Sequence, residues 1–252
     1  MRAIVRSIPA SFANALSATP PDPPIDVALA REQHAHYVRA LEACGAAVTI
    51  LAADEACPDC VFVEDTAIVL GGTALVTRPG APSRRKETPA IATALSALVD
   101  VTVMTEPATL DGGDVMRVGS RIFVGRSART NEAGIAQLFA AFGPQGFIVT
   151  PLDLPPHVLH LKCVVTPLGG DRILLADDSI PADAFGGDAV VRVPRDETYA
   201  ANCVAIGDHA IVAEGYPAAH AALRAAGFAL HVVRCSEVQK ADGSLTCQSI
   251  VF

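Results

Sequence analysis

The sequence carries an internal repeat, which restricts the possible folds more than any other feature does. Each copy predicts two short strands joined by a glycine turn, then a helix or linking segment, then a third strand. Thr66, Asp114 and Lys162 lie at matching points of three copies and are each 48 residues apart. A further 41 and 44 residues lead on to Cys203 and Cys247. Units repeated at this spacing can form one closed ring around an axis.

The repeat accounts for most of the chain. Before it we expect a strand at 2–8, a proline-rich loop at 20–24, a helix that ends at Gly45 and a strand at 47–51. The first copy predicts a helix with Thr88 as N-cap and Ile91, Leu95 and Leu98 as its buried stripe. Helices are also expected around 135–142 and 216–226. The strands of the four copies are predicted at 62–70, 73–77, 101–104, 114–118, 121–125, 147–150, 161–167, 172–176, 189–193, 203–206, 209–213 and 229–233.

The last predicted strand, at 246–252, has no hairpin partner of its own. The strand at 2–8 can supply one, which completes a fifth copy and closes the ring. The sequence therefore predicts a five-bladed α/β propeller of pseudo-five-fold ββαβ units, with residues 1–252 as a single domain. A doubly wound α/β sheet with incidental hairpins is the alternative. The near-constant period of the hairpins favours the propeller.

Composition excludes several classes of protein. Of the 252 residues, 51% are hydrophobic and 18% are charged, which favours a well-buried core over disorder. The net charge of −8 argues against nucleic acid or an anionic membrane face as a partner. No apolar run approaches the roughly 18 residues that span a bilayer, and the N-terminal apolar run is too short for a signal peptide. We therefore expect a cytoplasmic protein.

Seven cysteines form an odd set in a long chain, which indicates reduced thiols. Most of them are expected to be small buried hydrophobic residues, and one of them could be reactive. Cys57 and Cys60 have a spacing that zinc sites use, but no second pair follows at a suitable distance. We therefore expect no metal site.

Polar residues gather at the start of the first strand in each unit, where rotational symmetry would bring them to one central cavity. They are Asp59, Glu64, Asp65, Asp111, Asp114, His160 and Cys247. A cysteine and a histidine together indicate thiol catalysis, because a thiolate attacks and an imidazole moves the proton. Taken singly, Cys247 could be a packing residue and His160 a core histidine whose ring is hydrogen-bonded. Their shared place in the repeat favours the catalytic interpretation.

Glu64 and Asp65 interrupt an apolar segment, where unpaired charges are costly. They could hold a metal or an organic cation, and a guanidinium would match them through paired hydrogen bonds. Alternatively, one pairs with an arginine of the fold, or both reach solvent. Arg84 and Arg129 could clamp a substrate carboxylate or be solvated loop residues. The glycines at 112–113 lack the lysine and the spacing of a phosphate loop.

Several motifs, in order and at matching spacing, resemble those of the dimethylarginine dimethylaminohydrolase family. They lie at 58–65, 77–87, 110–115, 123–125, 129–131, 159–162, 201–203 and 242–247 and so cover nearly the whole chain. This family belongs to the guanidino-group-modifying superfamily, whose fold is the five-bladed α/β propeller called the pentein. The resemblance implies a hydrolase that converts Nω-methylated arginines to citrulline and methylamine or dimethylamine without a cofactor.

The resemblance also implies a role for each residue. Cys247 would attack the guanidinium carbon, His160 would be general acid and base, and Asp111 would take the place of a second catalytic acid. Substrate-binding positions would be Leu16, Asp59, Glu64, Asp65, Arg84, Arg129 and Ala241. Leu16 matches a lid residue only if a one-residue gap is allowed. Ala241 stands where the family uses a backbone carbonyl.

Other functions stay open at this point. Arginine deiminase uses the same catalytic set, although it normally carries an extra helical domain, and an amidinotransferase would pass the amidino group to an amine. A related translation factor uses the same propeller without the cysteine, as a non-catalytic binding protein. The sequence does not decide between a monomer and a homodimer, or among the methylated arginines.

Overall fold

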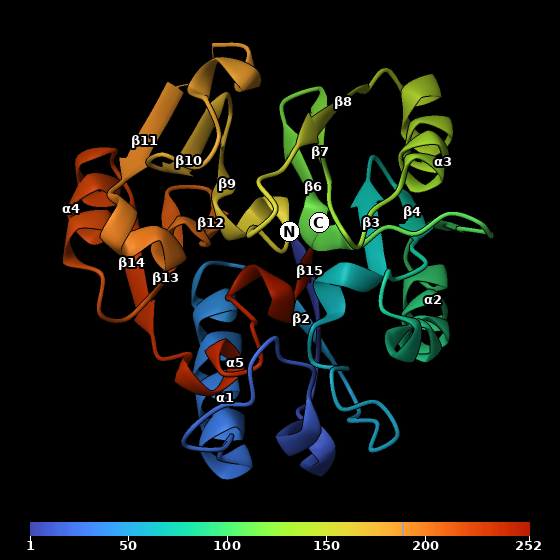
Figure 1. Cartoon of the computed structure of the whole chain (residues 1–252), viewed down its shortest axis with the longest axis horizontal. Coiled ribbons are helices and arrows are strands. Elements are labelled where there is room, and N and C mark those ends of the chain that lie inside the picture. The colour runs from blue at the N-terminus through green and yellow to red at the C-terminus, as the bar shows by residue number, and fades with distance from the viewer. Residues whose placement is uncertain (188) are drawn as a thin grey trace.

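The computed structural model describes residues 1–187 and 189–252. These residues form five three-stranded sheets, which Figure 1 shows arranged around the centre of the molecule. This is the five-bladed α/β propeller that the repeat predicts. Within the described residues, the helices are all too short or too polar to cross a membrane.

The blades follow one another along the chain except where the two ends meet. Their strands are β15 (Ile250–Val251), β1 (Arg2–Arg6) and β2 (Ala47–Leu51); β3 (Ala67–Leu70), β4 (Thr73–Val76) and β5 (Asp100–Val103); β6 (Val115–Val118), β7 (Arg121–Arg126) and β8 (Ile148–Asp153); β9 (Val165–Gly169), β10 (Arg172–Ala176) and β11 (Ala189–Val193); and β12 (Val204–Ile206), β13 (His209–Ala213) and β14 (Ala229–Val233). The α-helices are α1 (Val27–Ala43), α2 (Thr88–Ser96), α3 (Glu132–Phe142), α4 (Pro217–Ala225) and α5 (Ser236–Gln239).

Every blade has the same strand order. The first strand lies antiparallel to the second, and the third lies parallel to the second after a crossover. The first strands are innermost, because β9 contacts β6 and β12 of the adjacent blades and β3 contacts β15. The beginnings of these inner strands therefore lie around a common axis.

The two ends of the chain close the ring. β1 pairs antiparallel with β15, with Ala3 opposite Val251 and Ile4 opposite Ile250. The predicted partnership of the first and last strands is thus confirmed. Because β15 follows Cys247 by only a few residues, closure of the ring also fixes the C-terminal segment in the core.

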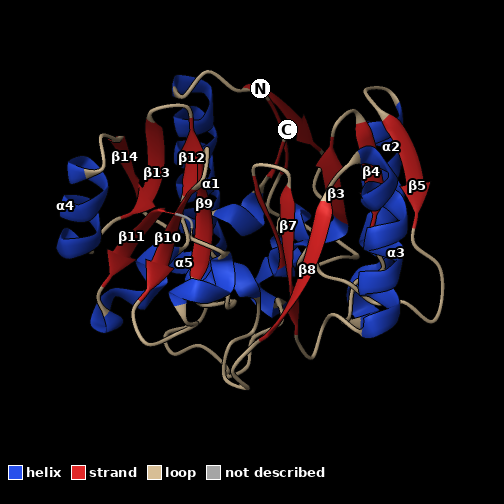
Figure 2. Ribbon diagram, turned by 90° about the horizontal axis from the view of Figure 1, so that it is seen from above, coloured by secondary structure: helices blue, strands red, loops and turns tan. Residues whose placement is uncertain are grey.

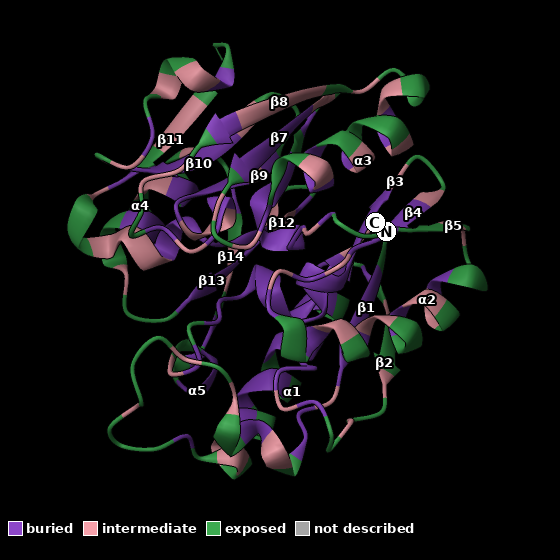
Figure 3. Cartoon of the chain, turned by 45° about the vertical axis from the view of Figure 1, so that its right-hand side comes forward, coloured by how far each residue is buried: buried purple, intermediate pink, exposed green. Residues whose placement is uncertain are grey.

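The helices cover the outside of the strands, as Figure 2 shows for α2, α3 and α4. The Asp26 side chain caps α1 by accepting from the backbone N–H groups of Ala28 and Leu29. Gly45 follows α1 with a φ of +87°, a conformation that favours glycine. The crossover between β10 and β11 carries the short 3₁₀ helix Ala182–Phe185. Figure 3 shows buried strands inside and exposed helix faces outside.

The predicted starting residues of the inner strands are wrong. Four of the inner strands, β3, β6, β9 and β15, are each preceded by a 3₁₀ helix. These 3₁₀ helices are, in the same order, Val63–Thr66, Gly112–Asp114, Leu161–Cys163 and Thr246–Gln248, so the strands begin later than the apolar pattern indicated. A tight 3₁₀ turn and a buried strand both present short apolar runs, so the pattern does not separate them. Cys247 consequently lies on a 3₁₀ turn and not on a strand.

Two details of α2 also differ from the prediction. Its N-cap is Glu87, and Thr88 is the first helical residue. Leu98 lies beyond the helix and is 37% exposed, whereas Ile91 and Leu95 are buried as expected. The helix ends at Ser96, two residues before Leu98, so Leu98 does not continue the buried stripe.

Candidate active site

A cavity of about 1190 Å³ opens where the inner strands begin. The 3₁₀ turns before these strands contact one another around the axis. Val63–Thr66 contacts both Thr246–Gln248 and Gly112–Asp114, and Gly112–Asp114 also contacts Leu161–Cys163. The residues predicted for the site that line this cavity are Leu16, Asp59, Asp65, Arg84, Arg129, His160, Ala241 and Cys247. Asp111 lies directly behind it, whereas the Glu64 carboxylate faces elsewhere.

His160 is held in a charged form at one wall of the cavity. Its Nε2–H donates to Asp111 Oδ2 over 3.1 Å, and both side chains are buried. Burial alone would lower the pKa of His160, but the negative charges of Asp65, Asp111 and Asp114 raise it to about 9. The imidazole is therefore protonated at neutral pH and can donate a proton.

Asp65 lies beside this imidazolium and is itself paired. Arg84 Nη1 donates to Asp65 Oδ2 over 2.5 Å, and the Gly113 N–H donates to Oδ1 over 2.9 Å. Burial would raise the pKa of Asp65, but His160 and Arg84 hold it below its ordinary value. Of the alternatives weighed from the sequence, the pairing of one carboxylate with an arginine of the fold is the one found.

Arg84 is a buried residue and not a solvated one. It also donates to the carboxylate of Glu87 and to the Phe62 carbonyl oxygen, the latter over 2.7 Å. Burial opposes the charge of this guanidinium, but Asp65 and Glu87 together raise the pKa of Arg84 above its ordinary value. Arg129 is freer, with its Nη1 3.8 Å from Asp111 Oδ2 and its side chain 26% exposed.

Two further residues position His160. Asp114 was among the polar residues expected at the central cavity but was given no role there, and Gly113 was not predicted. Asp114 Oδ1 accepts from the Leu161 N–H over 3.0 Å, and its Oδ2 accepts from the hydroxyls of Ser127 and Thr130. A Cβ on Gly113 would lie 2.8 Å from His160 Nδ1, so only glycine leaves room for the ring. Asp114 was noted at the start of its repeat, and that position was the available signal.

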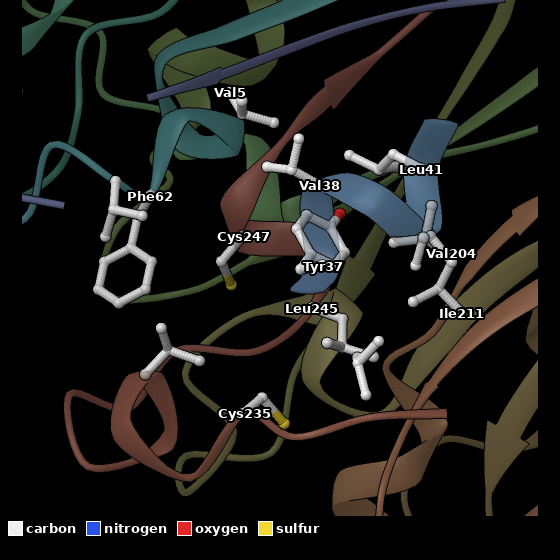
Figure 4. Close-up of a cluster of buried hydrophobic side chains, with 14 of the residues drawn as sticks. Val5, Tyr37, Val38, Leu41, Phe62, Val204, Ile211, Cys235, Leu245 and Cys247 are labelled. Carbon is white, nitrogen blue, oxygen red and sulfur yellow. The ribbon is translucent and has the colours of Figure 1, made fainter. Parts of the chain in front are cut away.

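Cys247 belongs to a second wall of the cavity, in apolar surroundings. It belongs to a buried cluster with Val5, Tyr37, Phe62 and Leu245, and Figure 4 draws it among these side chains. Burial, followed by the nearby charges of Glu64 and Asp65, raises the pKa of Cys247 well above its ordinary value. The free thiol is therefore protonated, and a cation beside it would favour the thiolate.

The residue before Cys247 is fixed by two partners from other blades. The Thr246 N–H donates to Asn202 Oδ1 over 2.9 Å, and the Thr246 hydroxyl donates to Glu64 Oε2 over 2.7 Å. Lys162 Nζ donates to the other oxygen of Glu64 over 2.6 Å. Glu64 and Lys162 line a second cavity, of about 560 Å³. Glu64 thus lies behind Cys247, on the far side from the substrate-sized cavity.

The residues after Cys247 are fixed by α1. Tyr37 Oη shares a hydrogen bond of 2.7 Å with Ser249 Oγ, and His34 Nδ1 lies 3.0 Å from Gln248 Oε1. Sequence reasoning did not identify these supports. For Asn202 and Thr246 a signal existed, because each directly precedes a repeat-marked cysteine, as Asp65 precedes Thr66. For His34 and Tyr37 there was no such signal, because α1 is more than 200 residues before Cys247 in the sequence.

The mouth of the cavity is bridged by the segment that follows the 3₁₀ helix Ala10–Asn14. The Leu16 N–H donates to Asp59 Oδ1 over 2.9 Å, and the Ala18 N–H donates to Asp242 Oδ2 over 2.6 Å. Leu16 is 42% exposed. Asp242, which has a φ of +55°, adjoins the buried Ala241. The 16–18 segment therefore spans the opening and lies where a lid would lie.

Asp65, Asp111 and His160 also meet the spatial requirement for a metal site, since their ligand atoms lie within 4.8 Å of one another. However, Arg84 and the Gly113 N–H bind Asp65, and the Gly80 N–H and His160 bind Asp111. A metal ion would have to displace these donors. The group is better suited to holding a proton on His160.

Comparison with known proteins finds relatives along nearly the whole chain. The family model described as N,N dimethylarginine dimethylhydrolase, eukaryotic, matches residues 19–202. The dimethylarginine dimethylaminohydrolase of Pseudomonas aeruginosa is 36% identical over 229 residues, which cover 90% of both chains. That of Streptomyces coelicolor is 39% identical and covers 90% of this chain and 87% of its own. The solved P. aeruginosa enzyme, a mutant complexed with citrulline, aligns over 100% of this chain and 98% of its own with a TM-score of 0.95 at 34% identity.

A five-bladed α/β propeller whose central cavity joins a cysteine, a histidine and carboxylates defines a guanidino-group-modifying enzyme. Within that class the identities and coverage are decisive. The chain belongs to the dimethylarginine dimethylaminohydrolase family.

Proposed function

We propose that this enzyme hydrolyses Nω-methylated arginines, such as asymmetric dimethylarginine and monomethylarginine, to citrulline and dimethylamine or methylamine. The observation that carries the proposal is one cavity with a protonated imidazole on one wall and a neutral thiol on the other. Such a pair suits a cationic substrate, because the substrate's own charge can ionise the thiol while the imidazolium keeps its proton for the leaving amine.

The first half-reaction is addition followed by elimination. When the cationic substrate binds, the Cys247 thiol releases its proton to solvent. The thiolate then forms a bond to the central carbon of the guanidinium, a carbon–nitrogen π pair moves onto nitrogen, and the carbon becomes tetrahedral. His160 then donates its proton to the methylated nitrogen, the carbon–nitrogen bond breaks and the amine leaves. The product is a covalent thiouronium on Cys247. Asp111 stabilises the imidazolium before transfer through its hydrogen bond of 3.1 Å.

The second half-reaction releases citrulline. Neutral His160 accepts a proton from water, and the water oxygen bonds to the thiouronium carbon. Collapse of this adduct breaks the carbon–sulfur bond and forms the carbon–oxygen double bond of citrulline. The remaining proton of the former water passes to the departing sulfur, which restores the Cys247 thiol. Neither step changes an oxidation state, so the proposed reaction requires no cofactor.

The remaining cavity residues would bind the substrate. Asp65 and Asp59 would present carboxylates to the guanidinium. Burial raises the pKa of Asp59, and a bound cation would oppose that shift. Arg129 and Arg84 would bind the amino acid's carboxylate. Since Arg84 is bonded to Asp65 and Glu87, it would have to exchange a bond to reach the substrate.

Leu16, Ala241 and Glu64 would act at the edges of the site. Leu16 would cover the bound substrate from the mouth, and the backbone carbonyl of Ala241 would accept a hydrogen bond from its amino group. Glu64 would contribute from behind, since its carboxylate holds Thr246 and hence the turn that carries Cys247.

We further propose that residues 1–252 act as one catalytic domain, since both ends of the chain pair in one sheet beside the cavity. A single chain would be sufficient for catalysis, because all the residues assigned here come from it. All seven cysteines are free thiols, which supports a reducing compartment such as the cytoplasm.

A citrulline assay over a panel of guanidino compounds tests the proposal. We expect much faster citrulline release from asymmetric dimethylarginine or monomethylarginine than from arginine. The panel includes glycine as an amine acceptor, so that transfer of the amidino group would also be detected. Preference for unmethylated arginine would indicate a deiminase instead. Release of no citrulline from any of these compounds would contradict the proposed reaction.

A further inference from the structure

A second group of thiol and imidazole side chains lies away from the active-site cavity. Cys44 directly follows α1, His209 begins β13 and His231 lies within β14. Their potential ligand atoms all lie within 4.8 Å of one another. All three residues lie outside the lining of the active-site cavity. The reaction proposed above does not use them.

The two imidazoles face each other because of the register of their strands. β13 and β14 are parallel, with His209 opposite Ala229 and His231 opposite Ile211, so the histidines lie on the same face of the sheet, two residues apart. Their ring centroids are 5.1 Å apart, and His231 Nε2 lies 3.0 Å from His209 Nδ1. Two ring nitrogens this close need a shared proton or another cation between them.

Cys44 approaches this pair from the helix side. α1 packs against both β13 and β14, which brings the thiol at its end over the imidazoles. Cys44 is buried at 8% exposure, whereas the His209 side chain is 37% exposed. The sulfur therefore lies at the back of the group and the imidazoles at the front, so an ion could enter from solvent.

The outer nitrogen of His209 has an acidic neighbour. Asp208 Oδ1 lies 3.6 Å from His209 Nε2, on the side of the ring away from His231. Histidines that bind metals usually direct their second ring nitrogen at a carboxylate or carbonyl oxygen, which fixes the tautomer and makes the ligating nitrogen more basic. Asp208 is placed to do this for His209.

We propose that Cys44, His209 and His231 bind a zinc ion, with water as the fourth ligand. Thiolate and imidazole are the ligands zinc prefers. Tetrahedral zinc with bonds of about 2.0 Å to nitrogen would separate the two nitrogens by about 3.3 Å, a few tenths more than in the ion-free pair. On binding, the Cys44 thiol gives up its proton to solvent and both histidines bind as neutral imidazoles.

The ion would join two blades that are far apart in sequence. α1 belongs to the blade of β1 and β2, and β13 and β14 belong to the preceding blade around the ring. α1 also holds Gln248 and Ser249, next to Cys247. A zinc ion at this seam would stabilise the helix that supports the thiol wall, without contacting the substrate.

Metal titration of the Cys247→Ser protein tests the proposal, because this background removes the reactive thiol of the active site. We expect one zinc ion to be retained per chain after dialysis and to raise the melting temperature relative to protein treated with chelator. With cobalt as a spectroscopic substitute, a thiolate-to-cobalt charge-transfer band should appear, since Cys44 would be a ligand. Metal retention with no such band, or no retention at all, would overturn the site.

Single variants then assign the ligands. Cys44→Ser, His209→Gln and His231→Gln should each weaken zinc binding by at least about tenfold. His36→Gln is the matched control, because His36 is an exposed histidine on α1, and it should bind zinc normally. His209 is partly exposed, so its variant should fold even if the buried Cys44 variant does not, which circular dichroism would establish. Unchanged binding in His209→Gln and His231→Gln, or equal loss in His36→Gln, contradicts the proposal.

Discussion

The two walls of the active-site cavity are built by opposite means. The wall of His160 is an array of paired charges, with Asp65, Arg84 and Asp111 in direct hydrogen bonds. The wall of Cys247 is an apolar cluster supported by α1 and by neutral hydrogen bonds such as that of Ser249, with the Glu64 carboxylate holding Thr246 behind it. One wall therefore favours a charged group, and the other favours an uncharged one.

This difference determines the resting protonation state of each catalytic group. The surrounding carboxylates raise the pKa of His160 to about 9, whereas burial and nearby negative charge raise that of Cys247 well above its ordinary value. Both groups thus hold their protons at neutral pH. A guanidinium between the walls would favour a thiolate through its positive charge, and it would repel the imidazolium, whose charge Asp65 and Asp111 stabilise. The predictions below alter one wall at a time.

The largest effect is expected from Cys247→Ser, which removes the nucleophile from the apolar wall. A serine hydroxyl cannot be ionised by a nearby cation to the extent a thiol can, so kcat should fall by on the order of 10⁴ or more. Steady-state citrulline assays measure this loss. The hydroxyl is close in size to the thiol, so the melting temperature should stay within about 4 °C of the parent. Turnover that survives the change would show that another group is the nucleophile.

Asp111→Asn should have the next largest effect, on the charged wall. The amide oxygen can still accept from His160 Nε2–H, but the negative charge that favours the imidazolium is lost. We expect kcat to fall by about 10²–10⁴-fold. The alkaline limb of the kcat–pH profile should move to lower pH, because the pKa of His160 falls. Asp111→Glu keeps the negative charge, so it should lose less kcat than Asp111→Asn and should shift the alkaline limb less. An unshifted profile would mean that Asp111 does not support the imidazolium.

The charged wall also predicts a pH dependence of stability. The pKa of His160 is about 9 in the folded protein, above its ordinary value of 6.5. Its contribution to stability is therefore fully present below about pH 6.5 and is lost as pH rises through about 9. The free energy of unfolding, from urea titrations, should be smaller at pH 9 than at pH 6.5. The difference should shrink in His160→Gln; an equal difference in that variant would assign it to other groups.

The repeat in the sequence was sufficient to predict the fold, because each copy carries its own hydrophobic pattern. It also indicated which residues lie near the axis, since equivalent positions of a closed ring must converge. Leu16, Asp59, Asp65, Arg84, Arg129, His160, Ala241 and Cys247 all line one cavity. The direction in which each side chain points could not be predicted from the repeat. Glu64 and Asp65 are adjacent, yet the turn that carries them sends one toward Lys162 and the other toward Arg84.

The partners that hold the site were harder to predict, because they are distant in sequence and chemically ordinary. Tyr37 and Ser249 are 212 residues apart, and a tyrosine at a helical core position reads as packing. The same holds for Cys44, His209 and His231, which the sequence presents as a helix end and two separate strands. The register of β13 and β14 brings the two histidines together, and the packing of α1 on these strands adds Cys44.

The smallest predicted effect separates support of the thiol wall from its chemistry. Tyr37→Phe removes the hydrogen bond of 2.7 Å to Ser249 and leaves that buried hydroxyl without this partner. The free energy of unfolding should fall by about 1–2 kcal/mol. The turn that carries Cys247 would be less well fixed, so kcat should fall only several-fold, about 3–10-fold. No charge changes, so the kcat–pH profile should keep the parent's alkaline limb, unlike that of Asp111→Asn. Tyr216→Phe, which alters a phenol outside the cavity lining, should leave kcat unchanged. A shifted limb in Tyr37→Phe would mean that the two walls are electrostatically coupled through α1, and the contrast between them would fail.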